Sequence, residues 1–295
     1  MNQRTIYALG FFDGVHLGHQ ALLSTCRELA DRHGCAAGAL TFTVHPDGLV
    51  SGKAPALLTT TEDRRKLLYA YGMEQVVELP FDRALMTTPW ESFLTGLTDK
   101  GAAGFVCGDD FRFGDGGKGT AKELTDFCRQ RDLPCAVVPQ QSVGHTRVSS
   151  THIRSLLAEG EMAEAAAFLG HPYALTGTVT YGKQLGRTIG IPTANIPLTE
   201  GLCVPKFGVY ACKVIVDGES YSAVTNIGTR PTVSGEGISV EAHLLDFAGD
   251  LYGKEMTVAF YRFLRPEQKF ENLEALKLQI AADIAQVRKH LESLL

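Results

Sequence analysis

Two histidines three residues apart mark the first candidate site. His16 and His19 end the sequence GFFDGVHLGH, which follows a short apolar segment and opens a helical pattern. Both imidazoles share the first-turn face of the predicted helix, where free backbone N–H groups and the helix dipole attract anions. Gly10 and Gly14 let the backbone approach a ligand closely. Zinc needs a third ligand, and none lies near in sequence. The pattern therefore favours a phosphate site over a zinc pair or two surface histidines.

A second candidate is the segment RVSSTHIR, residues 147–154. Ser150 and Thr151 are natural helix N-caps, and Arg154 lies in the first turn. Alone, the segment is only a capped helix with a surface arginine. It follows the last strand of the predicted sheet, however, at the edge that carries the histidines. Arg147 and Arg154 at that edge suit a triphosphate, which they would hold by charge-assisted hydrogen bonds.

A third candidate is GKQLGRTIGIPTANI, residues 182–196, in which glycines frame Lys183 and Arg187. Small residues let the backbone fold over a phosphate, and the two cations attract it. The Thr193 hydroxyl and the Asn195 carbonyl are hard oxygen ligands suited to Mg²⁺. The alternative is a Gly-rich turn followed by a proline-stiffened strand. The framing glycines are Gly182, Gly186 and Gly190.

The fourth candidate is a carboxylate in the strand pattern SVEAHLLDF, residues 239–247. Alternate residues of a strand share a face, so the apolar set Val240, Ala242 and Leu244 points into the predicted core. Glu241 then faces a cleft, where a carboxylate suits a general base. An ordinary solvent-facing glutamate is the alternative.

The elements that must position these residues change character near residue 170. Before it, short apolar strands alternate with helices, which predicts a mostly parallel, doubly wound α/β sheet with ligands at the strands' carboxyl ends. The predicted strands are 4–12, 35–44, 75–79, 104–108 and 134–139. The predicted helices are 16–34, 61–72, 89–101 and 120–131, with two short helices in 149–170.

After residue 170 the segments are rich in β-branched and aromatic residues and are separated by Gly and Pro. This pattern predicts an antiparallel β-barrel followed by a C-terminal helix at 272–295. We therefore expect two domains, 1–170 and 171–295. The predicted barrel strands are 173–181, 208–216, 221–227, 238–247 and 256–264.

Composition excludes several classes of protein. The 295 residues are 44% hydrophobic, enough for packed cores, and carry a net charge of -5. Neither half is basic, so a nucleic-acid partner is not expected. No apolar run is long enough to cross a bilayer, and the N-terminus lacks the pattern of a signal peptide. The seven cysteines form no CxxC pair, which indicates free thiols in a reducing cytoplasm.

Together these motifs resemble the prokaryotic bifunctional riboflavin kinase/FAD synthetase family, from about Ile6 to Arg288. The resemblance is carried also by TF..HP at 41–46, GDDFRFG at 108–114, NIGTRPTV at 226–233 and FLRPEQKF at 263–270. It implies a Rossmann-like HxGH nucleotidyltransferase domain that adenylylates FMN and a barrel that phosphorylates riboflavin. Both activities use ATP and Mg²⁺, so the implied partners are riboflavin, FMN, FAD and ATP.

The resemblance assigns roles to the candidates. Glu241 becomes the kinase general base, Thr193 and Asn195 the metal ligands, and His16, His19 and Arg154 the groups of adenylyl transfer. The ATP-binding set is Gly10, Phe11, Asp13, Gly14, Ser150, Thr151, Gly182, Lys183, Gly186, Arg187 and Gly190. The flavin-binding set is His45, Asp109, Phe111 and Arg265.

Two departures and two rivals accompany this interpretation. Phe11 stands where Asn is common, and Thr43-Val44 replaces an acidic-proline pair, which bears on the efficiency of the transferase half. The first rival is a pantetheine- or nicotinate-nucleotide adenylyltransferase, which has no reason to carry the barrel motifs. The second is a non-catalytic flavin-binding regulator. Formation of FMN and FAD from riboflavin and ATP would exclude it. The sequence does not determine the oligomeric state.

Overall fold

The computed structural model describes residues 4–181, 190–232 and 235–292. The chain divides into two compact units, Met1–Ser150 and Thr151–Leu295. The second unit therefore includes the two helices that precede the barrel. The predicted domains 1–170 and 171–295 were defined by the change of sequence pattern, not by compactness. Their boundary near residue 170 therefore stays a prediction.

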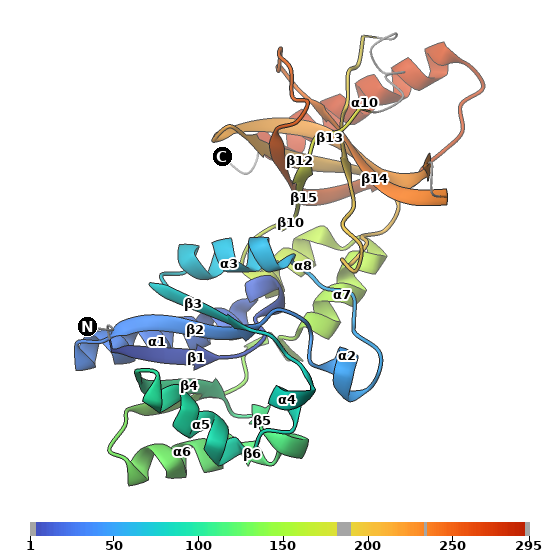
Figure 1. Cartoon of the computed structure of the whole chain (residues 1–295). Coiled ribbons are helices and arrows are strands. Elements are labelled where there is room, and N and C mark those ends of the chain that lie inside the picture. The colour runs from blue at the N-terminus through green and yellow to red at the C-terminus, as the bar shows by residue number, and fades with distance from the viewer. Residues whose placement is uncertain (1–3, 182–189, 233–234, 293–295) are drawn as a thin grey trace. The chain divides into compact units, whose positions relative to one another are not determined.

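The first unit is built on a five-stranded parallel sheet in the order β3-β2-β1-β4-β7 (Figure 1). Apolar residues of α1 and α3 pack on one face of this sheet, and those of α5 and α6 pack on the other. The predicted doubly wound architecture is therefore confirmed. The strands are β1 (Thr5–Leu9), β2 (Ala36–Phe42), β3 (Gln75–Leu79), β4 (Ala102–Gly108) and β7 (Cys135–Val138). The helices are α1 (Leu17–His33), α3 (Thr61–Ala70), α5 (Trp90–Asp99) and α6 (Ala121–Gln130).

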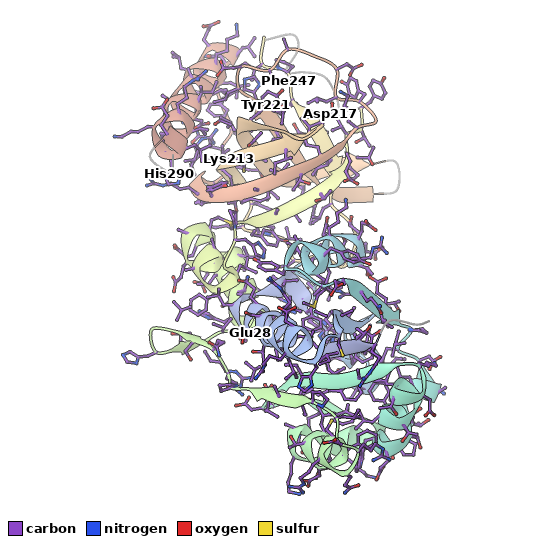
Figure 2. The ribbon with its side chains drawn as sticks, turned by 90° about the vertical axis from the view of Figure 1, so that its left-hand side faces the viewer. Glu28, Lys213, Asp217, Tyr221, Phe247 and His290 are labelled. Carbon is purple, nitrogen blue, oxygen red and sulfur yellow. The ribbon has the colours of Figure 1, made fainter. Side chains whose placement is uncertain are left out.

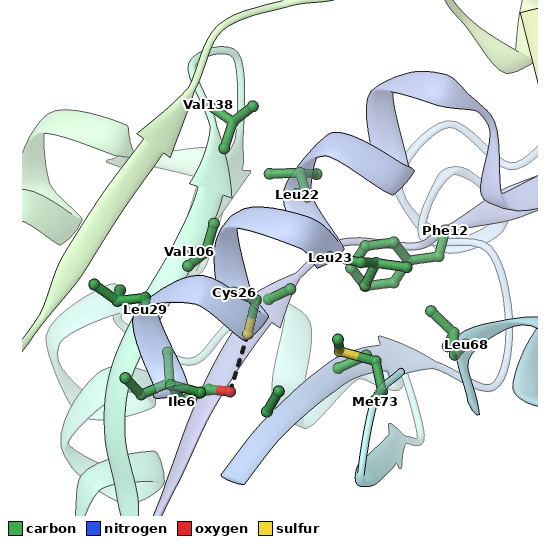
Figure 3. Close-up of a cluster of buried hydrophobic side chains, with 14 of the residues drawn as sticks. Ile6, Phe12, Leu22, Leu23, Cys26, Leu29, Leu68, Met73, Val106 and Val138 are labelled. Carbon is green, nitrogen blue, oxygen red and sulfur yellow. Dashed lines mark hydrogen bonds between the residues drawn. The ribbon is translucent and has the colours of Figure 1, made fainter. Parts of the chain in front are cut away.

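Helix α1 is fixed to the sheet by a packed apolar face. Leu22, Leu23 and Cys26 are buried against strand residues such as Ile6 and Val106 (Figure 3). The Cys26 thiol donates to the Ile6 carbonyl oxygen at 3.2 Å, and burial raises its pKa to about 11. All seven cysteines are free, and five of them are buried. The helix that begins at the histidine pair is thus held by its far side.

Several short elements in the loops were not predicted, because two to four residues are too few to show a periodicity. Most lie in loops that leave the carboxyl ends of parallel strands, where ligands bind in such sheets. They are η1 (Asp13–Val15), α2 (Asp47–Val50), α4 (Arg83–Met86), β5 (Arg112–Phe113), η2 (Asp115–Gly117), β6 (Gly119–Thr120), β8 (Ser142–Val143) and β9 (Thr146–Arg147).

The second unit is an antiparallel six-stranded sheet in the order β10-β15-β12-β13-β14-β11. A bridge between Thr180 and Asn195 links the chain after β10 to β11, so the first and last strands of the sheet meet. The predicted barrel is therefore confirmed. The elements are α7 (Ser150–Glu159), α8 (Met162–Leu169), β10 (Tyr173–Thr178), β11 (Ala194–Pro197), β12 (Gly208–Val216), β13 (Glu219–Thr232), β14 (Gly235–Leu244), β15 (Glu255–Arg265) and α10 (Leu273–Glu292).

Aromatic contacts finish one end of the barrel. Tyr221 of β13 and Phe247, which follows β14, lie near one another (Figure 2) and meet edge to face with ring centroids 5.1 Å apart. The rings of Tyr181 and Tyr252 stack with their centroids 3.9 Å apart.

In the described part of the chain, no helix combines the length and the hydropathy that a membrane span requires.

Helix α10 is joined to the barrel by an apolar face and two ion pairs of different exposure. Val287 and Leu291 are buried against β12 and β13. Arg265 at the end of β15 meets the fully buried Asp283 with Nη2 to Oδ2 at 2.8 Å and Nε to Oδ1 at 3.1 Å. Arg288 pairs with the exposed Asp246 at 2.8 Å. The two pairs connect the same helix to the same barrel, so they form a matched comparison.

We predict that Asp283→Asn lowers the free energy of unfolding of the second unit by about 3 kcal/mol, because it leaves a mostly buried guanidinium without its carboxylate. Asp246→Asn should cost less than about 1 kcal/mol, because solvent screens that pair. Urea unfolding followed by hydrogen exchange of β12 and β15 amides measures both. Equal losses in the two variants would contradict the assignment of the buried pair as the main tie of α10.

Candidate functional site

A cavity of about 360 Å³ opens in the first unit at the carboxyl ends of β1, β2, β4 and β7. It gathers residues from loops far apart in sequence, as the parallel topology requires. Nine predicted site residues line it: Gly10, Phe11, His16, His19, His45, Asp109, Phe111, Arg147 and Ser150.

The histidine pair is stacked and partly fixed by the helix it begins. The rings of His16 and His19 are 3.6 Å apart and 10° from parallel. His16 is the N-cap of α1, and its Nδ1 accepts the backbone N–H of His19 at 3.3 Å. A neutral His16 therefore carries its ring proton on Nε2, the tautomer that donates to a phosphate oxygen.

His19 is held as a neutral imidazole. Burial lowers its pKa well below the ordinary value of 6.5, and the neighbouring His16 and Arg64 lower it further. The ring of Phe12 meets it edge to face at 5.3 Å. At neutral pH His19 is therefore a hydrogen-bonding group that brings no charge of its own.

The turn before the helix is strained and is held by Asp13. Phe12 and Val15 have φ of 60° and 42°, and positive φ is unfavourable for residues with a Cβ, above all for a β-branched one. The Asp13 carboxylate accepts the backbone N–H groups of Leu58 and Thr59 at 2.8 and 3.2 Å. The Gly14 N–H also donates to the Thr59 hydroxyl at 3.2 Å. Asp13 and Gly14, both predicted to bind ATP, thus hold the conformation of the turn through contacts with residues 58 and 59.

The predicted flavin side of this cavity is aromatic and acidic. The His45 ring meets Phe11 edge to face at 4.6 Å, and its Nδ1 accepts the backbone N–H of Asp47 at 3.2 Å. Phe111 stacks on Phe113 with centroids 5.5 Å apart. An ion pair between Arg147 and Asp110 joins two lining loops, and the sequence did not indicate this pairing.

The remaining transferase candidates fall in different places. The Ser150 hydroxyl donates to the Asp13 carbonyl oxygen at 3.2 Å. Thr151 and Arg154 belong to the second unit, so their approach to the histidines stays a prediction. Thr43 and Val44 do not line the cavity; Thr43 bonds to the β3 backbone, and Val44 is exposed.

Glu241 lines a cavity of about 280 Å³ in the second unit. Val240, Ala242 and Leu244 are buried, which confirms the predicted alternation along β14. Strand register places Glu241 opposite Asn195 of β11 and opposite Asn226 of β13. The carboxylate is therefore carried by a central, doubly paired strand.

Thr193 lines both the Glu241 cavity and a neighbouring cavity of about 330 Å³ bounded by Phe247 and Tyr252. Asn195, two residues on, is buried. A hydroxyl, an amide oxygen and the carboxylate opposite are the hard donors that suit Mg²⁺, with phosphate oxygens completing its shell. Within the described ranges, no group of three His, Cys, Asp or Glu side chains is placed to hold a metal ion.

The other residues predicted to bind ATP in the second unit are only partly described. Gly190 has φ of 79°, a conformation that favours glycine. The remaining four, Gly182, Lys183, Gly186 and Arg187, lie outside the described residues.

Arg265 lines the Glu241 cavity, as expected for a flavin-side residue, but its charge is already bound by Asp283. The sequence did not indicate Asp283 or Glu267. Glu267 accepts a hydrogen bond from the Asn226 amide at 3.0 Å. A signal for Asp283 existed, because it stands on the helical face that carries the buried Val287. A lone carboxylate on an apolar face indicates a buried partner.

Comparisons with known proteins agree with this two-site arrangement. Residues 1–152 match the family model described as FAD synthetase, and residues 169–291 match that described as riboflavin kinase. Proteins named bifunctional riboflavin kinase/FMN adenylyltransferase are 36% identical in Listeria monocytogenes and 39% identical in Escherichia coli K12. Each alignment covers 94% of this chain and 90% of the relative.

A solved structure is similar over the whole length. The crystal structure of a Streptococcus pneumoniae protein described as a macrolide-efflux protein matches with a TM-score of 0.88 and 29% identity. The match covers 98% of this chain and 95% of that one.

The lowered pKa of His19 makes the stability of the first unit depend on pH. Below about pH 6.5 the unfolded chain binds a proton at His19 that the folded chain does not. The free energy of unfolding therefore decreases as the pH is lowered. His19→Gln lacks this loss. We therefore predict that the stability advantage of the wild type over His19→Gln shrinks by about 1.4 kcal/mol between pH 7.5 and pH 5.5.

Urea unfolding followed by the fluorescence of Trp90, the single tryptophan, measures this difference in the first unit. His33→Gln at the exposed end of the same helix controls for the loss of an imidazole. A difference in stability between wild type and His19→Gln that is the same at both pH values would contradict a neutral, half-buried His19.

Proposed function

The chain belongs to the bifunctional riboflavin kinase/FMN adenylyltransferase family, and from this premise we propose how its own residues carry the two reactions. The enzyme phosphorylates riboflavin to FMN with ATP, and it then adenylylates FMN with ATP to give FAD and pyrophosphate. The observation that carries the division of labour is chemical. One unit presents a stacked histidine pair at a helix N-terminus, and the other presents a carboxylate opposite two asparagines.

In the kinase reaction the 5′-hydroxyl of riboflavin attacks the γ-phosphorus of ATP. An alcohol is a poor nucleophile at neutral pH, so a base must accept its proton as the bond forms. Glu241 is the group for this role, because it lines the cavity and its strand is paired on both sides. Arg265, held by Asp283, positions the β15 side of the same cavity.

Thr193 and Asn195 would hold Mg²⁺ beside this carboxylate, and the ion would neutralise charge on the phosphates and orient them. The protein's own part is geometric. Asn195 is fixed in register with Glu241, and its backbone carbonyl oxygen accepts the backbone N–H of Thr180 at 2.8 Å. The base and Asn195 therefore keep one spacing, set by the strand pairing.

The adenylylation reaction needs no base. The phosphate of FMN has a second pKa of about 6 and is already largely dianionic at neutral pH. Its obstacle is repulsion from ATP and the charge that builds on the departing pyrophosphate, and preorganised donors relieve both. His16, His19 and the N-terminus of α1 are such donors, and Arg154 is proposed to add a cation.

The remaining assignments follow from the same premise. The transferase function is assigned to residues 1–170 and the kinase function to 171–295. The partners are riboflavin, FMN, FAD and ATP, with no nucleic acid or membrane. Free cysteines support a reducing, cytoplasmic setting.

Glu241→Gln should lower the rate of FMN formation from riboflavin by about 100- to 10,000-fold, because the variant removes the proton acceptor. FAD formation from supplied FMN should stay at the wild-type rate. Chromatography with flavin fluorescence, after mixing with ATP and Mg²⁺, measures both products. Joint loss of the two activities in a folded variant would contradict separate sites.

His19→Ala should show the opposite pattern. We expect FAD formation from FMN to fall by about 100- to 1,000-fold, since a donor to the developing charge is lost, while FMN formation from riboflavin is retained. The same chromatographic assay applies, and the retained kinase rate reports the state of the second unit. A normal rate of FAD formation in this variant would remove the histidine pair from the mechanism.

A further inference from the structure

Arg64 is a buried cation for which the two reactions have no stated use. It lies in the first turn of α3, and its side chain is fully buried. Its Nη2 donates to the Phe42 carbonyl oxygen at the end of β2, at 2.6 Å. Among the described residues, Nε and Nη1 are buried and have no hydrogen-bond partner. Buried charges are normally paired and fully hydrogen-bonded, so the position calls for an explanation.

The guanidinium lies over an aromatic ring of the transferase cavity. Its central carbon is 4.2 Å from the centroid of the Phe11 ring. The resemblance assigns Phe11 to ATP, but its ring meets the flavin-side residue His45 edge to face. Phe11, His45 and Phe42 all line the cavity. A planar guanidinium stacks on a ring as well as donating to it, which an ammonium group does not do equally. Arg64 thus stands behind this part of the cavity wall.

In the part of the chain that the structure describes, two carboxylates act on the guanidinium through their charge, without a direct ion pair. Burial lowers the pKa of Arg64, and the charges of Asp13 and Glu78 oppose that lowering. Asp13 belongs to the strained turn and Glu78 to β3, so the guanidinium interacts with the loops after β1 and with both β2 and β3. The backbone of Phe11 is fixed separately, because the Thr41 hydroxyl donates to its carbonyl oxygen at 2.8 Å. Arg64 therefore contacts the ring of Phe11, and Thr41 contacts its backbone.

We propose that Arg64 is a positioning residue for adenylyl transfer, which sets the Phe11 ring, and through it His45, as the wall that binds the planar flavin of FMN. This proposal rests on the assignment of the cavity to FMN adenylylation. The wall binds the ground state and the transition state alike, because the flavin ring does not react. Its loss therefore raises KM for FMN and leaves kcat nearly unchanged.

Arg64→Lys removes the planar guanidinium group while it keeps the positive charge. We expect KM for FMN to rise about tenfold, the size of one cation–π and stacking contact, with kcat within about twofold of wild type. Phe11→Leu should raise KM to a similar extent. Arg65→Lys is the matched control. The neighbouring Arg65 is partly exposed and pairs with Glu62 and, at 3.6 Å, with Glu78. It makes no contact with the Phe11 ring, and lysine keeps its charge beside both carboxylates, so this variant should keep the wild-type KM.

The double variant Arg64→Lys/Phe11→Leu separates positioning from a general loss of structure. If Arg64 acts through Phe11, adding Arg64→Lys to Phe11→Leu changes KM no further, so the two effects are not additive. Additive effects, or an unchanged KM in Arg64→Lys, would overturn the proposal. If Arg64→Lys does not fold, as judged by Trp90 fluorescence, Arg64→Gln takes its place in the same comparison: a wild-type KM overturns the proposal, and a KM raised as far as in Phe11→Leu and not raised further in the double variant supports it. A wild-type enzyme that makes no FAD from FMN would overturn the proposed function itself.

Discussion

Repulsion between anions is the constraint on which the rest of this structure depends. ATP and FMN are both anionic, and the chain that must bring them together carries a net charge of -5. Attraction by net charge is therefore absent, and each phosphate group must be met by local donors. A stacked imidazole pair, a helix N-terminus and proposed Mg²⁺ ligands are short-range devices of this kind, effective because part of their surroundings is buried.

The fold supplies these devices at little cost in charge. In the first unit, parallel strands end together, and α1 begins at the same edge with His16 as its cap. The strained turn before it is kept by the buried Asp13 carboxylate, which accepts backbone N–H groups from a loop 45 residues away in sequence. In the second unit, strand pairing alone sets the spacing between Glu241 and Asn195. One site thus depends on a loop clamp and the other on sheet register.

Much of this arrangement was predictable from sequence, and the reasons differ by element. Strands of the first sheet and helices such as α1 show clear periodicities, and the alternation around Glu241 placed that carboxylate on the face opposite the core residues Val240 and Ala242. Hairpins of two-residue strands have no periodicity to read. Arg64 and Asp283 were missed because each acts through a tertiary contact. The ring beneath Arg64 and the guanidinium beside Asp283 belong to elements 53 and 18 residues away along the chain. Asp13 was predicted to bind ATP, whereas its carboxylate accepts backbone N–H groups of Leu58 and Thr59. A pattern of residue types does not distinguish a ligand contact from a hydrogen bond that holds the backbone.

The central claim is that two sites in one chain each carry one reaction with their own residues. The most direct measurement mixes Glu241→Gln and His19→Ala in equal amounts with riboflavin, ATP and Mg²⁺ and follows flavins by chromatography. We expect the mixture to form FAD after a lag in which free FMN accumulates, because each variant supplies the reaction the other lacks. A mixture that forms no FAD, although each variant keeps its remaining activity, would contradict this claim.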